Sequence, residues 1–128
     1  MNLEKFTERA QAAISTSQDV AIKKGHQQLD GEHLHYALVT QEDGLIPKLI
    51  SYMGQDVEWY VADLEKELSR IPSVHGSSVS NLYLTRRFSQ ILLNAQDEAK
   101  RFKDDYTSVE HIYIALLKER GTPSQKIF

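Results

Sequence analysis

Histidine is the residue type here with the widest chemical scope, because imidazole can bind metal ions and exchange protons near neutral pH. The chain has five histidines, and Glu32, His33 and His35 form their densest group. Side chains two residues apart on a helix point to different sides, so His33 and His35 cannot hold one ion together. The zinc-peptidase pattern, with histidines four residues apart, is absent. We therefore predict packing roles near helix starts for His33 and His111, and no metal site.

Nucleophilic residues do not support catalysis either. The chain has no cysteine, and none of its serines lies in a Gly-x-Ser-x-Gly elbow. A phosphate loop of the form Gly-x-x-x-x-Gly-Lys-Ser/Thr is also missing, so we expect no nucleotide hydrolysis and no cofactor in this stretch. Acidic residues such as Glu65 and Asp104 fall on expected helix faces or ends, where a solvated position is the ordinary role. These features give no support for an active site, and we predict a non-catalytic domain.

The composition narrows the classes of partner. Fifteen basic and eighteen acidic side chains give a net charge of −3, which does not favour nucleic acid or an anionic membrane as a partner. Apolar residues at 41% and charged residues at 26% are typical of globular proteins, and 128 residues suit one domain. The sequence contains no long apolar stretch and no signal-peptide pattern, so we expect a cytoplasmic location.

A duplication organises the chain. Residues 6–50 align without gaps on residues 84–128, an offset of 78, and about ten of the 45 pairs are identical. Many other pairs keep their apolar character, so one buried pattern is present twice and each half needs the other to cover its apolar face. We predict a compact domain with pseudo-twofold symmetry. Identical pairs include Thr7/Thr85, Arg9/Arg87, Glu32/Glu110, His33/His111 and Ala37/Ala115.

The hydrophobic periodicity is helical, and no convincing alternating run indicates a strand. Thr7 and Thr85 are predicted N-caps, and Gly25 is a predicted helix stop. We expect Trp59 to be partly exposed beside an inward stripe. The predicted fold is all-α, with helices over residues 7–24, 30–39, 45–53 and 56–69 and repeats of the first two from residue 85 and over 108–119.

The predicted domain is single and covers residues 1–128. Repeat one takes residues 1–70, a linker rich in serine takes 71–83, and repeat two takes 84–128. Nothing in the chain corresponds to residues 51–69 in the second copy, so repeat two is incomplete. We interpret the chain as the N-terminal fragment of a longer protein.

Leu93 is the first candidate for a binding surface. It lies off the buried stripe of its helix, and its counterpart in the first repeat is the polar Ser15. Either it covers a neighbouring helix, or it forms the wall of an apolar groove together with Ile91 and Leu92.

The threonine and glutamate pairs at the helix starts are the second candidate. Their simplest role is capping and compensation of the helix dipole. Alternatively, pseudo-twofold packing brings a threonine of one repeat close to a glutamate of the other, such as Thr7 of repeat one close to Glu110 of repeat two. Such pairs would form polar rims beside the apolar groove.

The sequence resembles a known family. Three segments of the first copy are similar to the duplicated N-terminal domain of Clp/Hsp100 AAA+ unfoldases. They are residues 6–11, Gly25-His26-Gln27, and Glu32-His33-Leu34 with Ala37-Leu38. The second copy matches too, through residues 110–112 and 115–117. Residues 71–76 resemble the ClpB disaggregase branch more than ClpA or ClpC.

This resemblance implies a fold of two four-helix repeats joined by a loop, the second one truncated here. It implies a client-recognition domain that engages unfolded or aggregated polypeptides, with the alternative of an adaptor-docking domain of a ClpA/ClpC-type degradative unfoldase. The ATPase modules, with their ATP and Mg²⁺, would lie beyond Phe128. The full-length protein would be a homohexamer that could work with an Hsp70-type co-chaperone, and the fragment would be a monomer.

The resemblance also implies site residues. It points to Leu92 in a shallow apolar groove and to Thr7, Thr85 and Glu110 at the edge of the groove. Asn94 and His111 depart from the apolar residues expected in such a groove, and Leu93 would partly compensate for them.

Overall fold

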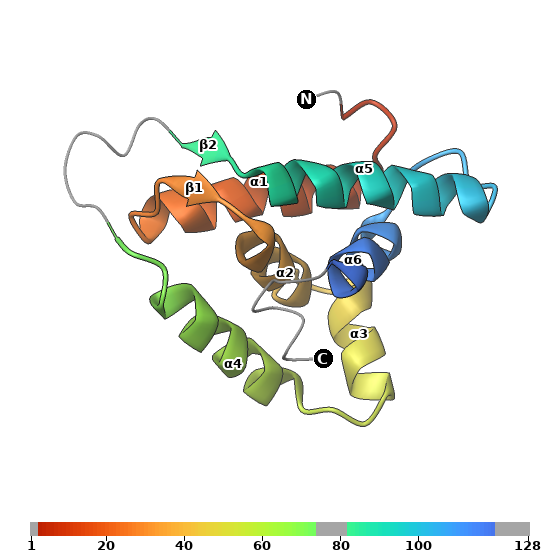
Figure 1. Ribbon diagram of the computed structural model, residues 1–128. Helices are drawn as coiled ribbons and strands as arrows, with labels where there is room; N and C mark the ends of the chain where they lie inside the picture. The colour runs from red at the N-terminus through yellow and green to blue at the C-terminus, as the bar shows by residue number, and fades with distance from the viewer. Residues whose placement is uncertain (1–2, 74–81, 120–128) are drawn as a thin grey trace.

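The computed structural model describes residues 3–73 and 82–119, and helices dominate this part of the chain (Figure 1). This result confirms the all-α prediction, and the predicted helix bounds agree to within about two residues. Two short strands were not predicted, since two residues are too few to show an alternating pattern. The elements in chain order are α1 (Glu8–Lys23), β1 (Gln28–Leu29), α2 (Gly31–Val39), α3 (Leu45–Tyr52), α4 (Val57–Ser69), β2 (Tyr83–Leu84), α5 (Arg86–Arg101) and α6 (Val109–Lys118).

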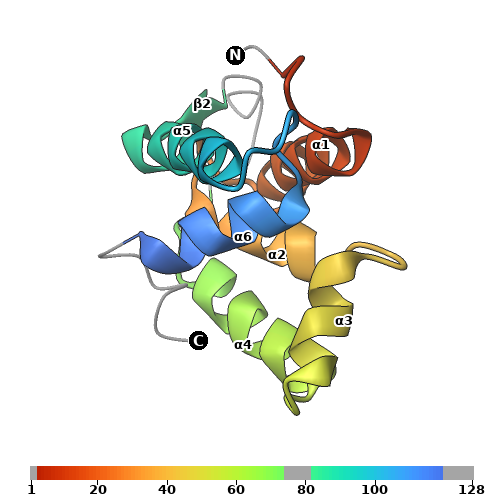
Figure 2. The same ribbon diagram turned by 90° about the vertical axis from the view of Figure 1, so that its right-hand side faces the viewer.

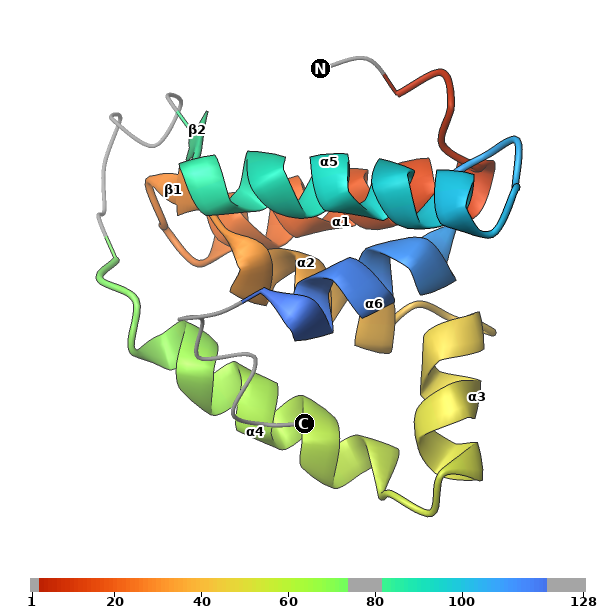
Figure 3. The same ribbon diagram turned by 45° about the vertical axis from the view of Figure 1, so that its right-hand side comes forward.

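The helices form three levels. Figure 2 shows α1 and α5 in one layer, α2 and α6 below them, and α3 and α4 on the far side. Helix α1 packs mainly on α2, and α5 packs mainly on α6, so each repeat contributes one such pair. The pairs meet where α2 contacts α6, while α4 covers α2 and α3 contacts α6 (Figure 3). The core therefore lies between the two repeats.

The strand contacts show the pseudo-twofold relation between the repeats. Strands β1 and β2 pair in parallel, with Leu29 opposite Leu84. An isolated bridge joins Phe6 to Thr107. At the offset of 78, Phe6 corresponds to Leu84 and Leu29 corresponds to Thr107. Each repeat thus makes the same backbone contact with the other.

Local capping explains where the long helices begin and end. The Thr7 hydroxyl accepts a hydrogen bond from the Ala10 amide at 3.2 Å, and the Thr85 hydroxyl accepts one from the Phe88 amide at 3.0 Å. Gly25 has a φ of 72°, a conformation that glycine adopts without a Cβ clash, directly after α1. These contacts confirm the two predicted N-caps and the predicted stop.

Helix α4 joins both repeats through Tyr60. The Tyr60 hydroxyl lies 2.7 Å from Nε2 of His35 on α2 and 2.8 Å from the hydroxyl of Tyr113 on α6. His35 and Tyr113 occupy equivalent positions of the two repeats, and all three side chains are buried. Tyr60 therefore ties the two middle helices together, whereas Trp59 beside it is 61% exposed.

The predicted linker and repeat limits are only partly visible. Residues 74–81 and 120–128 lie outside the described part of the chain. Tyr83, at the end of the predicted linker, belongs to β2 and pairs with repeat one. Among the described helices, none combines the length and the apolar character needed to cross a membrane.

Candidate binding site

A hollow of about 530 Å³ opens beside α5, and we call it the Leu93 hollow. Helix α5 supplies one side of it, and the segments that lead into α1 and α5 supply the rest. Two of its apolar residues, Phe6 and Leu84, are equivalent positions of the two repeats. The hollow is therefore shared between the halves. Its lining residues are Lys5, Phe6, Leu84, Ser89, Leu92, Leu93 and Gln96.

The apolar side chains of the Leu93 hollow differ in depth. Phe6 and Leu92 are each only 3% exposed, so they form its floor as part of the core. Leu84 is 39% and Leu93 is 56% exposed, so these two offer apolar surface to solvent. A floor held by the core and a wall open to solvent can accept an apolar side chain from another molecule.

The residues predicted for the groove do not all reach the hollow. Leu92 and Leu93 both line it, and the exposure of Leu93 disagrees with the alternative that it covers a neighbouring helix. Ile91 is fully buried, with its Cδ1 only 3.1 Å from where a Cβ on Gly31 would lie. It packs against the start of α2 and offers no surface to a ligand, because the helix turns it inward.

The predicted polar rim residues lie elsewhere. Thr7 and Thr85 are helix caps, and Glu110 is the second residue of α6, where its Oε1 is buried without a hydrogen-bond partner among the described residues. None of the three lines the Leu93 hollow. A threonine of one repeat does contact an acidic residue of the other, but this contact joins Thr85 to Asp30 and involves no glutamate.

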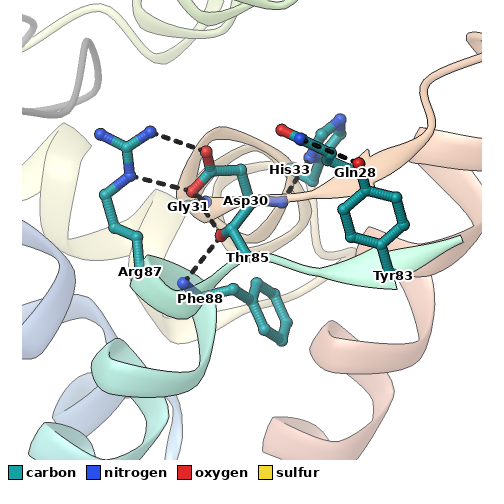
Figure 4. A network of polar contacts seen from close by, with 8 residues as sticks. All are labelled: Gln28, Asp30, Gly31, His33, Tyr83, Thr85, Arg87 and Phe88. Atoms are coloured by element: carbon teal, nitrogen blue, oxygen red, sulfur yellow. Dashed lines mark hydrogen bonds and ion pairs between the residues drawn. The ribbon is translucent and has the colours of Figure 1, made fainter.

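Asp30 is the centre of the polar contact between the repeats (Figure 4). Its carboxylate accepts hydrogen bonds from the Gly31 amide at 2.7 Å, the Thr85 hydroxyl at 3.0 Å, and the Arg87 Nε and Nη2 at 3.1 and 2.8 Å. Burial raises the pKa of Asp30, but these hydrogen bonds and the Arg87 charge outweigh it and hold the pKa below its usual value. The network therefore fixes the start of α5 on repeat one.

Ser108, His111 and Asp104 lie in an order that suggests a hydrolytic triad. The Ser108 Oγ is 2.9 Å from His111 Nδ1, and His111 Nε2 is 2.8 Å from Asp104 Oδ2. However, the same Nδ1 accepts the backbone N–H of Ser108 at 2.9 Å, as part of the capping box of α6. The ring is held for capping, so it is poorly placed to act as a general base.

The structure confirms the predicted packing roles of His33 and His111, which occupy the third position of α2 and α6 in matching capping boxes. As for metals, no cluster of three or more histidine, cysteine or acidic residues suited to an ion occurs within residues 3–73 and 82–119.

Sequence reasoning missed Phe6 and Leu84 as lining residues. The sequence did contain a sign that these two side chains pack against something, because both are apolar residues directly before an N-cap. Such residues usually pack on the fourth helical position, but that position holds Gln11 in α1 and Ser89 in α5. Without apolar partners there, their side chains are free to pack elsewhere.

Comparison with known families identifies the class of protein. Residues 5–128 match the family described as the Clp repeat (R) N-terminal domain. The chain belongs to this family, in agreement with the resemblance seen in the duplicated motifs.

The sequence relatives favour one branch. The chain is 44% identical over 121 residues to the chaperone protein ClpB of Nitratidesulfovibrio vulgaris and 43% identical over 129 residues to that of Clostridium tetani. These alignments cover 93% and 99% of the chain but only 14% and 15% of the relatives. The chain thus spans a small part of the length of the curated relatives it matches.

Solved structures show the same fold. The Hsp104 N-terminal domain from Candida albicans superposes with a TM-score of 0.83 at 22% identity, covering 98% of this chain and 80% of that one. The N-terminal domain of the ClpV1 ATPase from E. coli gives a TM-score of 0.80 at 18% identity, covering 91% and 70%. At these identities the likeness establishes the architecture.

Proposed function

We propose that this chain is the client-recognition domain of a ClpB-type protein disaggregase, and that the Leu93 hollow binds exposed apolar segments of unfolded or aggregated polypeptides. The observation that carries the proposal is the solvent-exposed Leu93 beside the buried floor of Phe6 and Leu92. The ClpB relatives at 43–44% identity support the branch.

Apolar contact suits a binder of many different clients. It is non-directional, so it recognises exposed hydrophobic surface without reading a particular sequence. A patch of roughly 100–200 Å² is worth about 2.5–5 kcal/mol before the costs of association, so one domain binds weakly. Lys5, Ser89 and Gln96 add polar groups to the lining that can meet the backbone of a client.

The proposal also covers the full-length protein. ATP and Mg²⁺ would be bound by ATPase modules outside these 128 residues, in a cytoplasmic homohexamer that could receive clients from an Hsp70-type partner. Several copies of a weak site around one ring raise the effective affinity without any new contact, because a client released by one copy is close to the next.

Serine substitutions in the hollow test this function. Leu93→Ser removes exposed apolar surface, so we expect it to weaken binding of a permanently unfolded polypeptide, such as reduced carboxymethylated α-lactalbumin, by several-fold in fluorescence anisotropy. Leu92→Ser should also weaken binding but lower stability more, since Leu92 is nearly buried. Ile22→Ser is the matched control, because Ile22 is 48% exposed on α1 and does not line the hollow. Equal binding by wild type, Leu93→Ser and Ile22→Ser would refute the assignment.

A second candidate function is adaptor docking, as in ClpA/ClpC-type unfoldases. A second hollow, of about 500 Å³, lies between α1 and the end of α2, and we call it the polar hollow because most of its lining residues are polar or charged. It could hold charged groups of a folded partner. Saturable binding of one folded protein at one-to-one stoichiometry, lost on substitution of Arg9 but kept in Leu93→Ser, would favour this function. The lining includes Glu8, Arg9, Thr16, Gln41 and Glu42.

A further inference from the structure

Two buried histidines face each other in repeat one. His26 Nδ1 lies 2.7 Å from His33 Nε2, and the two side chains belong to residues that are 2% and 0% exposed. His33 Nδ1 in turn lies 3.0 Å from the backbone nitrogen of Asp30. Both ring nitrogens of His33 are therefore engaged, one by a backbone amide and one by the second imidazole.

This geometry leaves one arrangement of protons for the neutral pair. The Asp30 amide can only donate, so His33 Nδ1 must accept and its proton must be on Nε2. His33 Nε2 then donates to His26 Nδ1, which places the His26 proton on its own Nε2. A further proton on His33 Nδ1 would face the Asp30 N–H, and one on His26 Nδ1 would face the His33 N–H. Protonation at either of these facing nitrogens thus costs one of the two hydrogen bonds.

The His26–His33 pair is linked through Asp30 to the other repeat. The backbone of Asp30 is held by His33, and its carboxylate is held by Thr85 and Arg87 at the start of α5. Figure 4 shows His33 and Arg87 on opposite sides of Asp30. The neighbouring Leu84 pairs with Leu29 and lines the Leu93 hollow.

We propose that the His26–His33 pair is an acid-sensitive latch: when it takes up a proton, the start of α2 loosens and the Asp30 contact that holds α5 to repeat one weakens. This regulation is separate from client binding and does not depend on what fills the hollow.

The charges around the pair make proton uptake unfavourable while the latch is closed. Burial is the main cause that lowers the pKa of His33, to about 4, with a further lowering from His26 and Lys24 and an opposing effect of Asp30. Burial also lowers the pKa of His26, and Lys24 adds to this. The Asp30 carboxylate does little to stabilise a positive charge on the pair, because it already forms an ion pair with Arg87. A proton therefore enters chiefly when the latch opens.

Repeat two has a carboxylate in place of the second imidazole. The counterpart of His26 is Asp104, which lies 2.8 Å from Nε2 of His111, the counterpart of His33. The Nε2 of His111 thus faces a carboxylate that is about half exposed, whereas the Nε2 of His33 faces a second, buried imidazole. Repeat one therefore buries a second imidazole where repeat two has none, so mild acid should loosen the start of α2 more than the start of α6.

The substitution His26→Asp tests the latch by giving repeat one the residue that repeat two has. Urea unfolding between pH 6.5 and pH 5 should show the folding equilibrium constant of the wild type falling about tenfold more than that of the variant. His35 is present in both proteins, so its own titration cancels in the comparison. An equal pH dependence of the two proteins would overturn the proposal.

Hydrogen exchange in the wild-type chain provides a second test that does not depend on the variant folding. We expect the protection of the Leu34 and Thr85 amides to fall several-fold more between pH 7 and pH 5 than that of Ile112 and Thr7, after correction for intrinsic rates. These are matched positions, because Ile112 and Thr7 are the counterparts of Leu34 and Thr85. An equal loss of protection in both repeats would contradict the latch.

Discussion

At the scale of single residues, exposure separates binding groups from packing groups. Leu92 and Leu93 are neighbours on α5, yet one is 3% and the other 56% exposed. Helical geometry turns successive side chains by about 100°, which places Leu92 on the buried stripe and Leu93 at its margin. The helical periodicity therefore shows that Leu93 is an apolar residue outside the buried stripe. Whether another element covers it depends on the tertiary packing.

Tyr60 gives a test at this scale. Tyr60→Phe keeps the ring but removes the hydroxyl that contacts His35 and Tyr113. Since these polar groups are buried and lose their partner, we expect the free energy of unfolding to fall by about 1–3 kcal/mol. Urea denaturation measures this change.

The control for Tyr60 is Tyr52→Phe, because Tyr52 is 90% exposed. We expect this control to change stability by less than about 0.5 kcal/mol. Equal effects of the two substitutions would show that the Tyr60 hydroxyl does not tie α4 to the middle helices.

At the scale of elements, duplicated caps allow each repeat to serve as the control for the other. Thr7 and Thr85 make the same N-cap bond, but Thr85 also donates to the Asp30 carboxylate across the repeats. We expect Thr85→Ala to destabilise the protein by about 1 kcal/mol more than Thr7→Ala, because the additional bond involves a charged acceptor. Urea denaturation of both variants checks this difference, and a larger effect of Thr7→Ala would refute the role of the Asp30 contact.

The elements also show how far the sequence could predict the structure. The helices and their caps were predictable, since Thr7 and Thr85 precede long stripes with a helical period. Strands β1 and β2 were not, because Tyr83 and Leu84 meet repeat one only after folding. The hollow was half predictable: Leu93 follows from its position on α5, whereas Phe6 and Leu84 join it through packing between the repeats.

At the scale of the whole molecule, the repeats fold around one core with buried, neutral histidines. Burial lowers the pKa of His35 to about 3 and that of His33 to about 4, from the ordinary value of 6.5. The unfolded chain therefore binds more protons below pH 6.5 than the folded chain. Stability must then fall as the pH decreases.

We expect the free energy of unfolding to decrease by about 1.4 kcal/mol per pH unit for each of His33 and His35 between about pH 6 and pH 5. Urea unfolding at a series of pH values measures this slope. A flat profile over this range would mean that the two rings are accessible to protons in the folded protein.

The central claim is that an apolar client segment binds the Leu93 hollow. The most direct measurement is amide NMR mapping of the chain during titration with an unfolded apolar polypeptide. We predict that the largest shifts occur at Leu84, Ser89, Leu93 and Gln96, with little change at Thr16 and Glu42 in the polar hollow. Shifts confined to the polar hollow, with none beside Leu93, would contradict the account.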